Sequence, residues 1–296
     1  MRTCSFLIVA MLGAACASPR PHDPVTTDPA SVDPTHPAAL AEATFESAGS
    51  SLNGIVYLAQ GAGPHPTAIL LHGLPGYERN LDLAQAIRRA GFNVVFFHYR
   101  GAWGSGGDFA FDHALQDVAA TIDQVRDPGF AATHRVDPER IALVGHSMGG
   151  FLALTVASDE PAVRCVASLA GANLGAAGQG ASPEQAAAFA RQIDGWTGPL
   201  AGTSGAALVR EVTQNAERYD TIRRVSAFAG RPVLLVAGTR DRTTPVAVAH
   251  DPLVRAFEEA GATQLTQVVL DTDHAFSSHR IALARAVVDW LTTACR

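Results

Sequence analysis

The chain contains no lysine: its 22 basic residues are all arginine, against 28 acidic residues, and its net charge is −6 at pH 7. Without lysine it cannot use a Schiff base, a lysine general base or a phosphate-binding loop that ends in lysine. The negative net charge argues against a nucleic-acid partner held by phosphate neutralisation. Charged residues are only 17% and hydrophobic residues 47% of the 296 residues, which excludes a wholly disordered protein.

The four cysteines are too few and too scattered for a disulfide scaffold or a cysteine-rich zinc site. We expect Cys165 and Cys295 to be unpaired buried thiols. A bridge between them, which would hold the C-terminal helix, is the alternative in an oxidising compartment. The histidines are scattered as well, so we expect neither a metal nor a nucleotide cofactor.

The apolar run near the N-terminus is too short to span a bilayer. Residues 1–17 combine Arg2, this apolar run and small residues before Ser18, a pattern typical of a signal peptide; a buried helix is the alternative. The segment LGAAC that ends at Cys16 resembles a bacterial lipobox, with its leucine one position too early. We therefore expect export to the periplasm or beyond, either in soluble form or anchored to a membrane through lipidated Cys16.

Proline dominates the segment that follows. Residues 18–43 show no apolar periodicity, and we predict a disordered Pro-rich tether there. A single domain is expected over residues 44–296. Within it, the Gly- and Ala-rich stretch at about 172–230 interrupts the alternation of strands and helices, and we interpret it as a lid insertion.

From residue 44 on, apolar runs of strand length alternate with amphipathic stretches. Strands are predicted at 53–59, 67–71, 92–98, 140–144, 163–169, 232–237 and 264–270, and the main helices at 79–90, 112–126, 148–158 and 280–292. This pattern predicts an α/β fold with a mostly parallel, twisted sheet and helices on both faces. Ligands bind such folds beyond the carboxyl ends of the strands, so the residues after each strand are the candidates for chemistry.

The pentapeptide GHSMG at 145–149 lies between a predicted strand and a predicted helix. A sharp turn in this context exposes the Ser147 hydroxyl, and both glycines are needed because side chains there would meet neighbouring backbone. The start of the helix directs N–H groups toward developing negative charge. We interpret Ser147 as a catalytic nucleophile; an incidental serine in a glycine-rich turn is the alternative.

Together with four other motifs, this turn makes the chain resemble the α/β-hydrolase superfamily over residues 45–291. The motifs are HGLPG at 72–76, YRG at 99–101, GHSMG at 145–149, GTRD at 238–241 and DH at 273–274. The resemblance implies the α/β-hydrolase fold and a serine hydrolase of the esterase or prolyl-oligopeptidase-like branch. It does not specify a substrate.

A serine hydroxyl needs a base to take its proton, and a histidine held by a carboxylate supplies one. In this fold the chain order is serine, acid, histidine. His274 follows the predicted strand 264–270 and is the predicted base, with His279 and His250 as the alternatives.

The predicted catalytic acid follows the strand predicted at 232–237. Asp241 begins a D-x-x-x-P run that is similar to the acid loop of the family, and it would orient the imidazole of the base. Asp271 and Asp273 are the rival carboxylates, and a cap for the helix after Pro245 is the structural alternative for Asp241.

Acyl transfer passes through an oxyanion that needs two prearranged donors. The N–H of Met148, directly after the nucleophile, is one, and the resemblance implies the N–H of Leu74 as the other. Pro75 has no N–H to offer, and His72 is expected to brace this loop. The loop 99–107 lacks the context of a phosphate cradle, and by resemblance its Arg and Trp brace the active-site wall, with substrate contact as the alternative.

These residues predict a serine hydrolase that cleaves a small-molecule ester through an acyl-enzyme, without a cofactor. A peptidase or aminopeptidase of the same fold, acting on a peptide-like substrate, is the first alternative. An aminopeptidase should carry paired acidic residues in the insertion, where Glu184, Glu211 and Glu217 are scattered. A noncatalytic surface lipoprotein is the second alternative.

Overall fold

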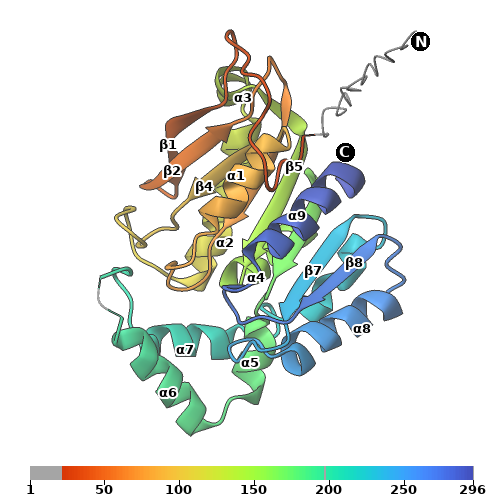
Figure 1. Ribbon diagram of the computed structural model, residues 1–296. Coiled ribbons are helices and arrows are strands. Elements are labelled where there is room, and N and C mark those ends of the chain that lie inside the picture. The colour runs from red at the N-terminus through yellow and green to blue at the C-terminus, as the bar shows by residue number, and fades with distance from the viewer. Residues whose placement is uncertain (1–21, 197, 296) are drawn as a thin grey trace, which may run out of the picture.

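The computed structural model describes residues 22–196 and 198–295. Within this part, a central sheet has eight strands in the order β1-β2-β4-β3-β5-β6-β7-β8 (Figure 1). The strands are β1 (Ala39–Ser47), β2 (Ser50–Leu58), β3 (His65–Leu71), β4 (Asn93–Phe97), β5 (Val136–His146), β6 (Val163–Leu169), β7 (Val233–Gly238) and β8 (Leu265–Leu270). β2 pairs antiparallel with β1 and β4, and every other neighbouring pair is parallel.

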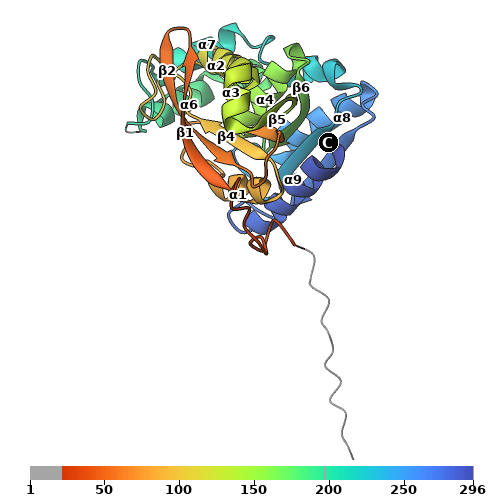
Figure 2. The same ribbon diagram turned by 90° about the horizontal axis from the view of Figure 1, so that it is seen from above.

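Helices cover both faces of the sheet, as Figure 2 shows from above. The helical elements are α1 (Leu81–Arg89), α2 (Phe111–Arg126), α3 (Pro128–His134), α4 (Met148–Asp159), α5 (Leu174–Gly180), α6 (Pro183–Asp194), α7 (Gly205–Gln214), η1 (Thr221–Phe228), η2 (Val246–His250), α8 (Asp251–Glu259) and α9 (Arg280–Ala294). α1 and α9 pack on one face, and α2, α3, α4 and α8 on the other. The predicted fold class is confirmed.

Two apolar cores result, one on each face of the sheet. In β5, Ile141 and Leu143 face the core under α2 and α4, whereas Ala142 and Val144 face the core under α1 and α9. Successive side chains of a strand point to opposite faces, so a strand covered on both sides must be apolar at every position. The uninterrupted apolar runs of the sequence have this origin.

The structure differs from the predicted disordered tether of residues 18–43. Its described part lies against the domain, where the carboxylate of Asp23 accepts two hydrogen bonds, of 2.7 and 2.6 Å, from the guanidinium of Arg285 on α9. The guanidinium of Arg89 donates to two backbone carbonyl groups of this segment, one of them that of Val25, whose side chain is buried. These contacts join residues far apart in the chain, which composition alone does not reveal. The predicted signal peptide and Cys16 lie outside the described residues.

The first strand also begins earlier than the predicted domain boundary at residue 44. Strand β1 starts at Ala39 and pairs along its whole length with β2. Its inward positions before Phe45 are alanines, whereas its large apolar side chain, Leu40, points outward and is 55% exposed. The hydrophobic alternation is therefore too weak to recognise in the sequence.

Cys165 and Cys295 form a disulfide, with 5.9 Å between their Cα atoms, so the expectation of two unpaired thiols is wrong. Cys165 lies in β6 and Cys295 directly follows α9, and both side chains are buried. The bridge closes a separation of 130 residues and fastens the end of the chain to the middle of the sheet.

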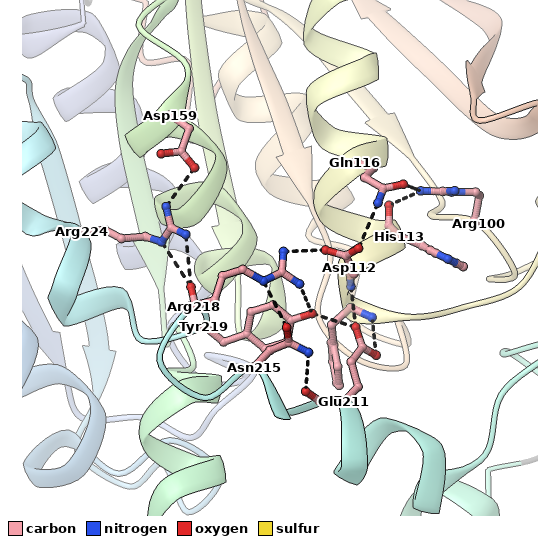
Figure 3. Close-up of polar contacts among 11 residues, drawn as sticks. Arg100, Asp112, His113, Gln116, Asp159, Glu211, Asn215, Arg218, Tyr219 and Arg224 are labelled. Atoms are coloured by element: carbon pink, nitrogen blue, oxygen red, sulfur yellow. Dashed lines mark hydrogen bonds and ion pairs between the residues drawn. The ribbon is translucent and has the colours of Figure 1, made fainter. Parts of the chain in front are cut away.

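The predicted insertion lies between β6 and β7 and consists of α5, α6, α7 and η1, at the carboxyl edge of the sheet (Figure 1). Glu211 of α7 joins it to the rest of the domain, because its carboxylate accepts hydrogen bonds from the N–H groups of Phe111 (3.1 Å) and Asp112 (2.7 Å) at the start of α2 (Figure 3). A negative charge at this end of a helix is favourable. Arg218 adds an ion pair with Asp112, and the hydroxyl of Tyr219 donates to Glu211.

Among the described residues, no helix has both the length and the apolar character needed to cross a membrane. The strands and helices thus form one layered domain, and the segments that follow the parallel strands all meet at the edge where the insertion lies.

The disulfide generates the first prediction. Replacing Cys295→Ala removes a bridge across 130 residues, and we expect the free energy of unfolding to fall by about 2–5 kcal/mol, because the unfolded chain regains conformational freedom. Urea unfolding without reductant measures this loss. Adding reductant should lower the stability of the wild type and leave the variant unchanged. The full chain also contains Cys4 and Cys16, so the pairing predicts two reactive thiols in the unfolded, unreduced wild type, and detection of four would contradict it.

Candidate active site

Ser147 occupies a strained turn between β5 and α4, with φ of 57° and ψ of −118°. The turn is tight enough that a Cβ at Gly145 would collide with the carbonyl group of Gly149, and one at Gly149 with that of Leu71. Such backbone geometry costs about 1–3 kcal/mol and persists only where the surrounding structure enforces it. Here the close packing of the turn against the end of β3 enforces it, as the glycine spacing predicts.

Asp241 and His274 meet beyond the carboxyl ends of β7 and β8. The Nδ1 of His274 lies 2.7 Å from Oδ2 of Asp241. A carboxylate can only accept, so Nδ1 carries the hydrogen and Nε2 of the neutral ring is left free to take a proton. The other oxygen of Asp241, Oδ1, accepts the N–H groups of Thr243 (2.7 Å) and Thr244 (2.9 Å). The carboxylate is thus fixed from two sides.

The pKa of Asp241 reflects these contacts. Burial on its own would raise the pKa, since a charged carboxylate is poorly solvated there. The hydrogen bond from His274 and those from the N–H and hydroxyl of Thr244 outweigh burial and lower the pKa from 3.8 to about 2. Asp241 is therefore ionised at neutral pH and suited to stabilise a positive charge on His274.

His146, the residue before the nucleophile, connects the turn of Ser147 to the segment that carries His274. Its Nε2 donates a 2.8 Å hydrogen bond to the carbonyl oxygen of His274, and the centroids of the two rings are 4.9 Å apart. Within the described chain, the hydrogen bonds include none between Oγ of Ser147 and His274. In sites without substrate such bonds are often long and tighten in the complex.

The alternative base and acid residues have other roles. His250 is buried at the start of α8 and His279 precedes α9, where its Nδ1 lies 3.0 Å from the hydroxyl of Ser278. Asp271 is exposed and pairs with an arginine, and Asp273 accepts a backbone N–H four residues ahead. Of the three candidate carboxylates, only Asp241 is hydrogen-bonded to the imidazole of His274.

The predicted oxyanion donors are close to Ser147 in the chain or in space. Met148 is the first residue of α4, and its N–H, like that of Leu74, has no hydrogen-bond acceptor among the described residues. The loop that carries Leu74 touches the nucleophile, since a Cβ placed on Gly73 would lie 2.9 Å from Cβ of Ser147. The two free donors could therefore converge on a substrate oxygen bound at Ser147.

The loop 99–107 braces the wall beside these donors, as predicted. The indole N–H of Trp103 donates to the carbonyl oxygen of Pro75 at 2.7 Å, and the guanidinium of Arg79 lies 4.4 Å above the indole ring. Arg100 forms a buried ion pair with Asp117 of α2, which anchors the loop to the core. The loop also pairs with the insertion through Ala102 and Leu200, and Trp196 of the insertion is half-buried against the core.

Three further histidines near the site are uncharged at neutral pH. Burial lowers the pKa of His72 to about 3 and those of His98 and His146 to about 4, because each ring would be poorly solvated as a cation. Sequence reasoning missed His98, His146 and the hydroxyl of Thr244 as parts of the site. The only signal was their position within or next to the motifs, and position does not show where a side chain points.

Among the described residues, no group of three or more His, Cys, Asp or Glu side chains could hold a metal ion. The arrangement consists of an imidazole oriented by an ionised carboxylate and of two backbone N–H groups without an acceptor among the described residues.

Comparisons with known proteins agree with this geometry. A model described as "Alpha/beta hydrolase family" matches residues 68–286. The uncharacterized protein YfhR of Salmonella typhi is 27% identical over 241 residues, which cover 77% of this chain and 72% of that protein.

Two solved structures share the fold. The acylaminoacyl peptidase of Pyrococcus horikoshii superposes with a TM-score of 0.66 at 17% identity, over 87% of this chain and 42% of that one, so this chain spans well under half of the peptidase. Est1E of Butyrivibrio proteoclasticus superposes with a TM-score of 0.64 at 19% identity, over 85% of this chain and 97% of Est1E.

The low pKa of Asp241 yields a prediction about stability and pH. A carboxyl whose folded pKa lies below 3.8 stabilises the fold above that pH, and this contribution is lost as the pH falls toward about 2. We expect Asp241→Asn to lower the free energy of unfolding by on the order of 1–2 kcal/mol at pH 7. The difference from wild type should shrink between pH 4 and 2.

Denaturant unfolding across this pH range measures the effect. The matched control is Asp271→Asn, an exposed carboxyl in an arginine ion pair, which should change stability by less than about 0.5 kcal/mol. A difference between wild type and Asp241→Asn that grows as the pH falls would contradict the prediction.

Proposed function

The chain belongs to the alpha/beta hydrolase family, and we propose that it is a serine hydrolase that cleaves carboxylic esters through an acyl-enzyme. The observation that carries this proposal is the 2.7 Å contact between His274 and Asp241, which leaves the other imidazole nitrogen free. This is the tautomer that a general base for a hydroxyl requires. The hydrogen bond from His146 to the carbonyl oxygen of His274 links this residue to the strained turn of Ser147.

In the proposed reaction, Oγ of Ser147 attacks the ester carbonyl carbon while Nε2 of His274 takes the hydroxyl proton. The negative oxygen that forms is held by the N–H groups of Leu74 and Met148. The bond to the alcohol then breaks, and the alcohol leaves with the proton from His274. Water, activated by the same imidazole, attacks the acyl-enzyme and releases the acid.

The contacts of the insertion favour an ester over a peptide with a free amino terminus. A peptidase that reads a free amine needs acidic side chains directed at the substrate. Glu211 is engaged by the start of α2, Glu184 is exposed and accepts the hydroxyl of Ser182, and Glu217 lies 3.7 Å from an arginine at the surface. Among the solved relatives, Est1E has also been determined with ferulic acid bound. We therefore propose a small-molecule ester as the substrate.

Export is proposed as well. The disulfide supports it, because disulfides persist in oxidising compartments outside the cytoplasm. The predicted signal sequence adds support from the amino-acid sequence. Radiolabelled palmitate incorporated into the wild type and not into Cys16→Ser would establish the lipid anchor, and its absence from both would leave export in soluble form.

The central test is ester turnover by wild type and Ser147→Ala. We expect the wild type to hydrolyse short-chain p-nitrophenyl esters and the variant to lose at least about 1,000-fold in kcat, because the nucleophile is removed. Ser226→Ala, a change at an exposed serine of η1, is the control and should keep wild-type activity.

Aminoacyl p-nitroanilides assayed in parallel test the peptidase alternative. Turnover of these anilides with no ester hydrolysis would favour a peptidase. Equal ester turnover by wild type and Ser147→Ala would remove Ser147 from the mechanism.

A further inference from the structure

His72 donates a hydrogen bond into the peptide group that carries one of the proposed oxyanion donors. Its Nδ1 lies 2.7 Å from the carbonyl oxygen of Gly73. A carbonyl oxygen only accepts, so Nδ1 of His72 carries the hydrogen. The carbonyl of Gly73 and the N–H of Leu74 belong to the same planar peptide unit. Whatever polarises this carbonyl therefore also polarises the Leu74 N–H.

A second histidine stands behind the first. Nδ1 of His98 lies 3.2 Å from Nε2 of His72. Since the hydrogen of the neutral His72 ring is on Nδ1, its Nε2 can only accept, and His98 must donate from Nδ1. The direction of both hydrogen bonds is thus fixed, and they run from His98 through His72 to the Gly73 carbonyl.

The surroundings hold both rings in place and keep them neutral. His72 is 1% and His98 9% exposed, and burial lowers the pKa of each. Arg79, which lies close enough for its positive charge to lower both pKa values further, opposes protonation of either ring. The ring of Tyr99 packs 4.4 Å from His72, and the hydroxyl of Ser105 donates to the backbone carbonyl of His98 at 2.9 Å.

We propose that His98 and His72 form a hydrogen-bond relay that strengthens the Leu74 N–H as a donor to the oxyanion. Hydrogen bonds in a chain polarise one another, by about 10–30% per bond. In a buried site such polarisation acts on the charge that develops in the transition state. His98 does not touch the substrate in this arrangement, so it is a positioning residue that acts through His72. The relay rests on the proposed function, because it needs an oxyanion at Leu74.

The expected effect is confined to the transition state, where the oxyanion exists. Losing a whole oxyanion donor costs about 100- to 1,000-fold in kcat. If the bond from His72 supplies about 10–30% of that effect on a logarithmic scale, loss of the whole relay lowers kcat by about 2- to 8-fold. Loss of His98 alone leaves the bond from His72 to Gly73 in place, so it lowers kcat by at most about 2-fold. KM should change by less than about 2-fold, because the ground-state ester carries little charge.

The test compares His98→Leu, which removes the donor, with His98→Asn, whose amide can donate from about the position of Nδ1. We expect the leucine variant to show the loss in kcat and the asparagine variant to recover most of it. His134→Leu is the matched control, since His134 is another partly buried histidine that stacks on an aromatic ring, Phe130, on α3. It should keep the wild-type kcat.

The tautomer of His72 gives a second measurement that needs no variant and no activity. The side-chain ¹⁵N shifts of the wild type should show hydrogen on Nδ1 and a bare, hydrogen-bonded Nε2. Hydrogen on Nε2 would overturn the relay, even in a protein without esterase activity.

The kinetic outcomes are equally decisive. An unchanged kcat in His98→Leu would overturn the relay. An equal loss of more than about 100-fold in both His98 variants would also overturn it, because polarisation through hydrogen bonds is too weak to produce so large an effect. A wild type without ester turnover would instead contradict the proposed function, and the ¹⁵N shifts would still test the relay.

Discussion

The close approach of the turn at 145–149 to the end of β3 is the constraint on which the site depends. The backbone of Gly149 comes so near the carbonyl of Leu71 that no side chain fits between them. This contact fixes Ser147 in its strained conformation and sets it against the loop that begins at His72. The nucleophile and one oxyanion donor are therefore positioned by the same packing, before any substrate arrives.

Charge is distributed around this turn in a consistent way. Asp241 is the buried carboxylate in contact with His274, and its hydrogen bonds keep it ionised. The three other histidines nearby are kept neutral by burial, so they serve as donors and acceptors of fixed direction. A positive charge that forms on His274 thus meets one negative partner and no competing cation among these rings, which favours proton transfer from the nucleophile.

Three contacts away from the catalytic residues join separate elements of the domain. The disulfide joins α9 to β6, the salt bridge of Asp23 joins the N-terminal segment to α9, and Glu211 joins the insertion to the start of α2. Each connects residues that are far apart in the chain. The first two lie on the face of α1 and α9, whereas the third lies between α7 and the start of α2 (Figure 3).

The amino-acid sequence by itself determined the fold class, most strand and helix positions to within a few residues, and the meeting of Asp241 with His274. It could do so because apolar periodicity and turn residues are local, and because parallel strands bring their carboxyl ends to one edge. The packed N-terminal segment, the pairing of Cys165 with Cys295 and the relay through His98 were decided only by the tertiary structure. Each depends on the distance or ring orientation between side chains remote in sequence, which no local pattern encodes.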